Sequence, residues 1–323
     1  MRKHVLIAVL VPLSGALRVV PVPAGRLVAL GDLHGDFQAA RNVLRLAALI
    51  DNDDNWCGGD TVLVQLGDLL DRGSEEQALW DLFERLRQQA PLEGGRVVQL
   101  LGNHEVLNAI GRAGNYIHPR GHTQFGANRC AAFMPGGELA KALADCPVAA
   151  IIGDSLFVHA SLPTDATEAS LTTLNAETRQ WLLGKRPAGP PEALLGGAGS
   201  PVWDRTFSSP SDMEPLGTEC NSLRITLRRL GVSRLVVGHT PQATVNSACE
   251  GSVWRCDTGL SRWVMDGACE ALEISERSGV RVLRAPPNGP GASGKKESSS
   301  DDLLTSEDAL NAPTCQLSVD DFS

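Results

Sequence analysis

Three short apolar segments in the first third of the chain each end in glycine followed by aspartate or asparagine. These junctions are RLVALGD (26–32), TVLVQLGD (61–68) and RVVQLLGN (96–103). The first two are followed by segments with apolar residues at helical spacing, 36–49 and 75–89. Strands that alternate with helices in this way predict an α/β domain. In such a domain, functional groups collect in loops at the carboxyl ends of the strands.

The second half of the chain is richer in predicted strands. AAIIGDSLFVHA (149–160) is typical of two buried strands joined by a Gly-Asp turn, and RLVVGHT (234–240) of a strand that ends in Gly-His. Further strands are predicted at VWRCD (253–257), ALEIS (271–275) and VRVL (280–283). The Pro- and Gly-rich region from 163 to 215 predicts an irregular surface excursion rather than a second domain.

The chain of 323 residues is long enough for one large catalytic domain with two terminal segments. Residues 1–25 start with MRKH, an apolar stretch and a small-residue site, which is typical of a secretory signal or an organelle-targeting leader; an N-terminal extension of a cytoplasmic protein is the alternative. The predicted catalytic domain spans 26–284. Residues 285–323 are rich in Ser, Gly, Pro and acid, and predict a disordered acidic tail.

The net charge narrows the range of partners. The formal charge is −9 and the pI is near 5.3, so the chain as a whole repels polyanions unless a local basic patch overrides the average. We therefore expect no nucleic-acid partner. No segment beyond the N-terminal stretch has the length and apolar content of a transmembrane helix, so the mature domain is not expected to insert stably into a membrane.

Eight cysteines are scattered along the chain without a C-x-x-C pair. This spacing argues against a zinc ribbon and against a thioredoxin-like motif. Most of the cysteines are expected to be small apolar residues of the core. In an oxidising compartment, Cys249 and Cys256 are the candidate pair for a disulfide across a hairpin.

Five strand ends deliver side chains that can bind a metal ion. They are Asp32 and His34 in GDLHGD, Asp68 in GDLLDRG, Asn103 in GNHE, His159 in FVHAS and His239 in VGHT. Taken singly, each has an ordinary explanation, because Asp or Asn after Gly is common in turns and a lone His beside a strand is usually a core residue. Their joint occurrence at successive strand ends favours a metal site.

The chemistry of this set points to borderline divalent ions. Two carboxylates, one amide oxygen and three imidazoles without a thiolate suit Mn, Fe or Zn better than Ca, whose ligands are all oxygen. Two ions that share a carboxylate lie about 3.5–4 Å apart, the separation that phosphatases and nucleases use for an in-line displacement. Two dications against two carboxylates leave a net positive centre, which favours a phosphate dianion.

Three further residues beside these ligands predict acid catalysis and phosphate binding. His104 follows Asn103 directly and is a candidate general acid for the leaving oxygen. Asp71 is the candidate carboxylate that orients His104 and keeps it protonated. Arg72 offers a planar fork for the phosphoryl oxygens.

The ordered motifs GDLHGD, GDLLDRG, GNHE, VHA and VGHT resemble those of the phosphoprotein phosphatase (PPP) group of calcineurin-like metallophosphoesterases. Longer strings, among them GGDTVLVQLGDLLDRG, LLGNHEVLN and VVGHTPQATVNSACEGSVWRCDTGLSR, are similar more narrowly to the Shewanella-like protein phosphatases. The resemblance covers roughly residues 26 to 275. His159 is followed by Ala-Ser-Leu rather than the Gly-Gly-Leu of the general serine/threonine enzymes, which fits the Shewanella-like branch.

The resemblance implies a four-layered α/β/β/α sandwich with mixed sheets. It implies two divalent ions, one held by Asp32, His34 and Asp68 and the other by Asp68, Asn103, His159 and His239. It further implies a His104–Asp71 acid pair, and phosphate binding by Arg72 together with Arg205 of the SPVWDRTFS segment. The implied reaction is hydrolysis of phosphate monoesters of proteins by direct attack of a metal-bridging hydroxide.

Two alternatives stay open. The same core serves nucleotide and dinucleoside polyphosphate hydrolases, although the negative net charge argues mildly against a polyphosphate substrate. A phospho-binding protein without catalysis is the other alternative, and the complete set of candidate ligands counts against it. The sequence leaves undecided the preference for phosphotyrosine or phosphoserine/threonine, the metal identity, the compartment and the oligomeric state.

Overall fold

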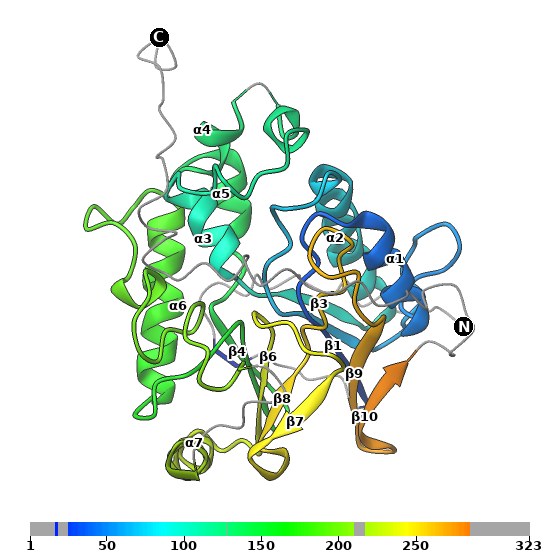
Figure 1. Ribbon diagram of the computed structural model, residues 1–323, viewed down its shortest axis with the longest axis vertical. Coiled ribbons are helices and arrows are strands. Elements are labelled where there is room, and N and C mark those ends of the chain that lie inside the picture. Colours follow the sequence, from blue (N-terminus) through cyan, green and yellow to red (C-terminus); the bar gives the residue numbers. More distant parts are fainter. Residues whose placement is uncertain (1–16, 19–24, 127, 210–216, 285–323) are drawn as a thin grey trace, which may run out of the picture.

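A computed structural model of the protein describes residues 17–18, 25–126, 128–209 and 217–284 (Figure 1). The predicted acidic tail lies outside the described residues, as does the N-terminal segment except for residues 17–18 and Gly25. Leu17 is buried against the core of the second sheet, and Arg18 forms an isolated parallel bridge with Ile151. Among the described residues, no helix has the length and apolar composition needed to cross a bilayer.

The first sheet has the strand order β10-β9-β1-β2-β3. Its strands are β1 (Arg26–Leu30), β2 (Val62–Gln65), β3 (Arg96–Gln99), β9 (Glu270–Ser275) and β10 (Gly279–Arg284). β1, β2 and β3 are parallel, whereas β9 runs antiparallel to both β1 and β10. The parallel trio therefore carries its three carboxyl ends to one edge of the sheet.

The second sheet has the strand order β4-β5-β6-β8-β7. Its strands are β4 (Ala149–Ile152), β5 (Ser155–Val158), β6 (Arg234–Val237), β7 (Asn246–Ala248) and β8 (Val253–Arg255). The central strands β5, β6 and β8 are parallel, and the edge strands β4 and β7 are antiparallel to their neighbours. Both sheets are thus mixed, as predicted.

Helices cover the outer faces of the two sheets (Figure 1). The α-helices are α1 (Phe37–Leu46), α2 (Glu76–Gln89), α3 (Asn103–Ala109), α4 (Arg129–Phe133), α5 (Glu138–Leu143), α6 (Glu168–Leu182) and α7 (Gly217–Leu230). Short 3₁₀ turns are η1 (Ala90–Glu93), η2 (Gly121–Thr123), η3 (Glu192–Leu194) and η4 (Cys249–Gly251). One core lies between the first sheet and α1 to α3, and another lies between the second sheet and α6 and α7.

Alternation of side chains along the strands fills the space between the sheets. In β1, Leu27 and Ala29 pack toward the second sheet, whereas Val28 packs toward the helices. In β6, Val236 packs between the sheets and Val237 packs toward α7. Three apolar cores in four layers confirm the predicted α/β/β/α sandwich.

The helix α6 contradicts the prediction of an irregular region from 163 to 215. Thr167 caps its first turn through the backbone N–H of Ser170. Two buried positions on its inner face are polar, Asn175 and Thr178, which weakens the apolar periodicity in the sequence. Instead of packing through an apolar side chain, Asn175 forms hydrogen bonds with the backbone at the start of β4. Its amide oxygen accepts from the Val148 N–H at 2.9 Å.

The candidate pair Cys249 and Cys256 does not form a disulfide. Cys249 is bonded instead to Cys220, across a sequence separation of 29 residues. η4 directs Cys249 toward α7, which carries Cys220, whereas Cys256 directly follows β8 and is buried between the sheets as a free thiol. The hairpin register therefore places the two predicted partners on different sides of the second sheet.

Candidate active site

The carboxyl ends of the parallel strands in both sheets meet at one place, and glycines make this approach close. A Cβ atom at Gly102 would lie 2.1 Å from Oδ1 of Asp68. A Cβ atom at Gly238, after β6, would lie 2.5 Å from Oδ1 of Asp32, after β1. The glycines of the Gly-Asn and Gly-His motifs therefore admit the two aspartates that follow the neighbouring strands.

Five of the predicted site residues have a left-handed backbone, which side chains other than glycine rarely adopt. They are His34 (φ 42°), Asp68 (φ 55°), Asp71 (φ 66°), Arg72 (φ 63°) and His239 (φ 70°). Each such residue costs on the order of 1–3 kcal/mol unless its surroundings hold it. The loops after β1, β2 and β6 therefore adopt unfavourable backbone conformations that place these side chains in the site.

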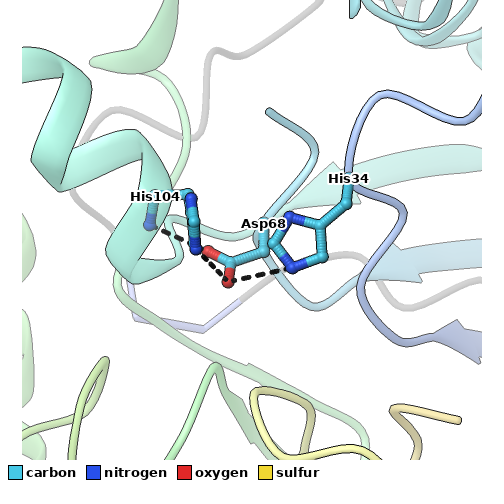
Figure 2. A group of neighbouring side chains, drawn as sticks. All are labelled: His34, Asp68 and His104. Atoms are coloured by element: carbon cyan, nitrogen blue, oxygen red, sulfur yellow. Dashed lines mark hydrogen bonds and ion pairs between the residues drawn. The ribbon is translucent and has the colours of Figure 1, made fainter. Parts of the chain in front are cut away.

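The Asp68 carboxylate lies at the centre of the cluster. Its Oδ2 atom is 3.3 Å from Nε2 of His159, 3.7 Å from Nε2 of His34 and 4.0 Å from Nε2 of His104. Figure 2 shows His34 from the loop after β1 and His104 from α3 on the two sides of Asp68. One carboxylate that faces three imidazoles is in a suitable position to bridge two cations.

Backbone carbonyls fix the imidazoles of the three predicted histidine ligands. Nδ1 of His34 lies 3.0 Å from the Leu70 carbonyl, Nδ1 of His159 lies 2.8 Å from the Leu66 carbonyl, and Nε2 of His239 lies 3.1 Å from the Trp203 carbonyl. A carbonyl can only accept, so these ring nitrogens carry the protons. The opposite nitrogens then present lone pairs to the centre of the site, the arrangement usual for metal-binding histidines.

The resulting donor set fits a bound cation. Around Nε2 of His159 lie Oδ1 of Asn103 at 2.9 Å, Nδ1 of His239 at 3.1 Å and Oδ2 of Asp68 at 3.3 Å. All of these atoms are acceptors in the neutral-histidine state that the carbonyls select. Acceptors buried this close together need a proton or a cation among them. The set of imidazole, amide and carboxylate ligands without thiolate suits a borderline divalent ion.

The electrostatics of this cluster agree with that interpretation. Burial lowers the pKa of His34 and of His239 well below the usual value, so both rings are neutral and able to bind a metal. Burial alone would also lower the pKa of His159, but the Asp68 carboxylate offsets this and raises it. The imidazoles of His159, His104 and His34 outweigh burial at Asp68 and hold the pKa of its carboxyl well below the usual range. Asp68 and His159 thus favour each other's charged forms, an interaction that a cation between them would replace.

Asp32 joins the cluster from the first sheet. Its Oδ1 accepts a hydrogen bond from the backbone N–H of His239 at 3.1 Å, and its Oδ2 lies 4.0 Å from Nε2 of His34. Burial raises the pKa of Asp32 well above its usual value, and the Asp257 and Asp68 carboxylates add to this effect. A carboxylate with that much unfavourable charge nearby would be stabilised by a cation.

His104 lies in reach of the metal-binding atoms but is held differently from the other histidines. Its Nδ1 contacts the Asp71 carboxylate at 2.8 Å rather than a backbone carbonyl. Purely by distance, His34, Asp68 and His104 form one group of three candidate ligands. An imidazole whose Nδ1 donates to a carboxylate can still bind a metal through Nε2. The assignment of Asp32 rather than His104 as the partner of His34 and Asp68 is the one that the family resemblance implies.

The two predicted phosphate-binding arginines lie at the edge of the cluster. The guanidinium of Arg72 stacks over the ring of Tyr116 at 5.4 Å from the ring centroid, and that ring also packs edge-on against His104. The Nη1 of Arg205 donates to Oγ1 of Thr240 at 2.7 Å, beside His239. Burial lowers the pKa of Arg205, while the charges of Asp257 and Asp32 counteract this.

The sequence reasoning missed Glu105, which supports the Asp68 loop. Its buried carboxylate accepts from the backbone N–H groups of Asp68 at 2.9 Å, Leu69 at 2.9 Å, Leu70 at 3.2 Å and Gly102 at 2.8 Å. It is the fourth residue of GNHE, so the motif itself carried the signal. Arg129 was also missed, and it lies behind Asp71 with Glu76 and Asn108.

A third missed residue is Asp257, which follows β8 in CDTGLS. Its carboxyl is buried and accepts from the Gly259 N–H at 2.7 Å, and burial raises its pKa to about 6. A Cβ at Gly31 would lie 2.5 Å from the Cα of Asp257, so the glycine before Asp32 admits this loop. An aspartate directly after a buried strand, as in the other motifs, was the available signal.

Comparison with known proteins shows the family of the chain. The family model of the calcineurin-like phosphoesterases matches residues 25–243, and the chain belongs to that family. It is 34% identical to Shewanella-like protein phosphatase 2 of Arabidopsis thaliana, over 81% of this chain and 78% of that protein. The resemblance to the Shewanella-like phosphatases is therefore confirmed.

Solved structures share the fold. A cold-active protein tyrosine phosphatase superposes with a TM-score of 0.65 at 26% identity, over 78% of this chain and 74% of that one. A protein serine/threonine phosphatase of Saccharomyces cerevisiae superposes with a TM-score of 0.59 at 18% identity, over 87% and 88% of the two chains, which shows the fold alone. With the family and the buried ligand cluster, the protein is a metal-dependent phosphatase that uses divalent ions.

Proposed function

We propose that residues 26–284 form a dinuclear phosphatase that removes phosphate from proteins. The observation that carries this proposal is the Asp68 carboxylate, whose Oδ2 lies 3.7 Å from Nε2 of His34 and 3.3 Å from Nε2 of His159. Asp32, His34 and Asp68 would hold one ion. Asp68, Asn103, His159 and His239 would hold the other, with Mn, Fe or Zn as the candidate metals.

The side chains around the ions have separate tasks in this proposal. When bound, the divalent ions supply the positive charge that binds phosphate and activates water for direct hydrolysis without a phosphoenzyme. Arg72 and Arg205 bind the phosphoryl oxygens from the edge of the cluster. His104, oriented by Asp71 at 2.8 Å, protonates the leaving oxygen.

A phosphorylated protein or peptide is the proposed substrate. The names of the relatives support it, because those proteins are called protein phosphatases and one solved neighbour is called a protein tyrosine phosphatase. A nucleotide or dinucleoside polyphosphate is the second candidate, because the same core could accept it. The N-terminal leader stays a proposal, and the Cys220–Cys249 disulfide favours an oxidising compartment over the cytoplasm.

The decisive experiment measures initial rates of the metal-stripped protein after addition of Mn. The substrates are paired phosphotyrosine and phosphoserine peptides, with a dinucleoside polyphosphate in parallel. Mn-dependent turnover of a peptide is the expected result, and the preferred peptide gives the residue preference. Turnover of the polyphosphate alone would overturn the protein substrate, and silence on all three would favour a binding protein.

Metal content tests the dinuclear site without relying on activity. Elemental analysis of the reconstituted protein should give about two ions per chain, as in two-metal hydrolases. Asp68→Asn should lower this number more than Asp32→Asn, since only Asp68 is shared. One ion per chain in the intact protein would contradict the dinuclear assignment.

A further inference from the structure

We propose that Arg129 is a positioning residue which, with Glu76 and Asn108, holds the Asp71 carboxylate against His104 and is thereby required for protonation of the leaving group. This inference rests on the acid role proposed for His104. Arg129 starts α4, which is far from the predicted motifs in the sequence.

The guanidinium of Arg129 is buried and almost fully engaged. Nη1 and Nη2 each lie 2.8 Å from a different oxygen of Glu76, a forked pair. The same Nη2 donates to Oδ1 of Asp71 at 3.2 Å and to Oδ1 of Asn108 at 3.0 Å. The rings of Phe125 and Phe133 lie against it at 5.3 and 5.0 Å. These contacts fix the orientation of the Arg129 guanidinium.

Asp71 is held from every side by this arrangement. Its Oδ2 contacts Nδ1 of His104 at 2.8 Å. Asn108 donates to both oxygens of the carboxylate, at 3.0 and 3.1 Å, and Nη2 of Arg129 donates to Oδ1. The backbone N–H of Asp71 donates to Oε1 of Glu76 at 2.8 Å. Backbone and side chain of Asp71 are therefore fixed by one connected network.

Charge balance explains why an arginine is needed at this position. Asp71 and Glu76 are both fully buried carboxyl groups in contact through the Asp71 backbone, and Arg129 is the cation that lies against both. Without Arg129, the two carboxylates would face each other with one fewer positive charge in a region of low dielectric. Asp71 would then rotate away from Glu76, and it would no longer orient His104.

The affected step is the departure of the leaving group. The oxygen of water forms a bond to phosphorus and loses one proton to solvent as the bond to the ester oxygen breaks, and Nε2 of His104 gives its proton to the ester oxygen. The neutral imidazole then regains a proton from solvent. An ester whose leaving group is a stable anion does not need this proton, whereas an ester of phenol does.

Leaving-group dependence separates a positioning role from a structural one. We would compare kcat for 2,4-dinitrophenyl phosphate and for phenyl phosphate in the Mn-loaded full chain, in Arg129→Met and in His104→Asn. Arg87→Met is the matched control, because Arg87 is a half-buried arginine on α2 that bonds Gln99 away from the site. Arg129→Met should lower kcat on phenyl phosphate about 100-fold and change kcat on the dinitrophenyl ester by less than about threefold.

The outcomes distinguish this inference from the proposed function. Equal losses on both esters in Arg129→Met, with a selective loss in His104→Asn, would overturn the positioning role alone. No selective loss in His104→Asn would overturn the acid role itself. If Arg129→Met does not fold, Asn108→Leu removes two contacts to Asp71 and should show the same selective loss, and equal rates on both esters in that variant would refute the inference.

Discussion

Replacement of Glu105 by glutamine should destabilise the protein severely and remove its metal. Oε2 of Glu105 accepts from the N–H groups of Asp68 and Gly102, and Oε1 accepts from those of Leu69 and Leu70. In glutamine one of these oxygens becomes an NH₂ group. Two buried backbone N–H groups would then face a donor in place of an acceptor.

The size of the loss follows from those two bonds. A hydrogen bond to a charged group contributes about 1.5–3 kcal/mol, and a buried donor left without an acceptor costs a similar amount. Two such losses lower the free energy of unfolding by about 3–6 kcal/mol, a large part of the ~5–15 kcal/mol of a typical domain. Glu105 is fully buried, so solvent offers no substitute acceptor.

Guanidinium denaturation followed by circular dichroism measures this loss, and elemental analysis measures the bound metal. Glu138→Gln, in the first turn of α5, is the control for the loss of one negative charge near a helix start. The Glu105→Gln variant should unfold at much lower denaturant with an unchanged slope. A change below about 1 kcal/mol would refute the claim that Glu105 holds the Asp68 loop.

Three other substitutions test separate features of the fold. Gly238→Ala should weaken metal binding and cost about 1–3 kcal/mol through overpacking against Asp32, whereas Gly217→Ala, which meets no atom within 4 Å, should change neither; isothermal titration with Mn measures the difference. Glu273→Gln should cost about 1 kcal/mol at neutral pH. Burial opposes ionisation of Glu273, but Arg281 and Arg26 lower its pKa. The stability lost in Glu273→Gln should therefore shrink as the pH falls below about 4, and denaturation at neutral pH and below about pH 4 checks this. Cys220→Ser opens a loop of 29 residues and should cost about 3–4 kcal/mol, and reductant should lower the thermal stability of the variant less than that of the parent.

The sequence was sufficient to predict every strand except β7, and the residues that gather at the strand ends; the arrangement in two sheets followed from the family resemblance. Short apolar strands that end in Gly-Asp, Gly-Asn or Gly-His leave few ways to arrange these groups, because parallel strands bring their carboxyl ends to one edge. The structure places Asp68 within 4.0 Å of His34, His104 and His159 accordingly. The catalytic and metal-binding roles of these side chains stay predictions.

The missed features depend on contacts between distant parts of the chain. Arg129 reaches Asp71 across 58 residues, and no periodic pattern surrounds it because α4 has only five residues. α6 escaped notice because Asn175 replaces an apolar side chain on its buried face. The partner of Cys249 depended on the direction of a short turn, η4, which a sequence pattern does not specify.

The loop from Asp68 to Gly73 is held by two buried carboxylates, those of Glu105 and Glu76, which are not candidate metal ligands themselves. Three of its residues have left-handed backbones, and a chain with free N–H groups would relax out of that shape. Glu105 accepts hydrogen bonds from the backbone N–H groups of residues 68–70. Glu76 accepts a hydrogen bond from the backbone N–H of Asp71. The metal-binding and acid-orienting parts of one loop are thus anchored by different carboxylates. Damage to Glu105 should therefore reduce metal content first, whereas damage to Glu76 should leave the metal bound and reduce only the turnover of esters with poor leaving groups.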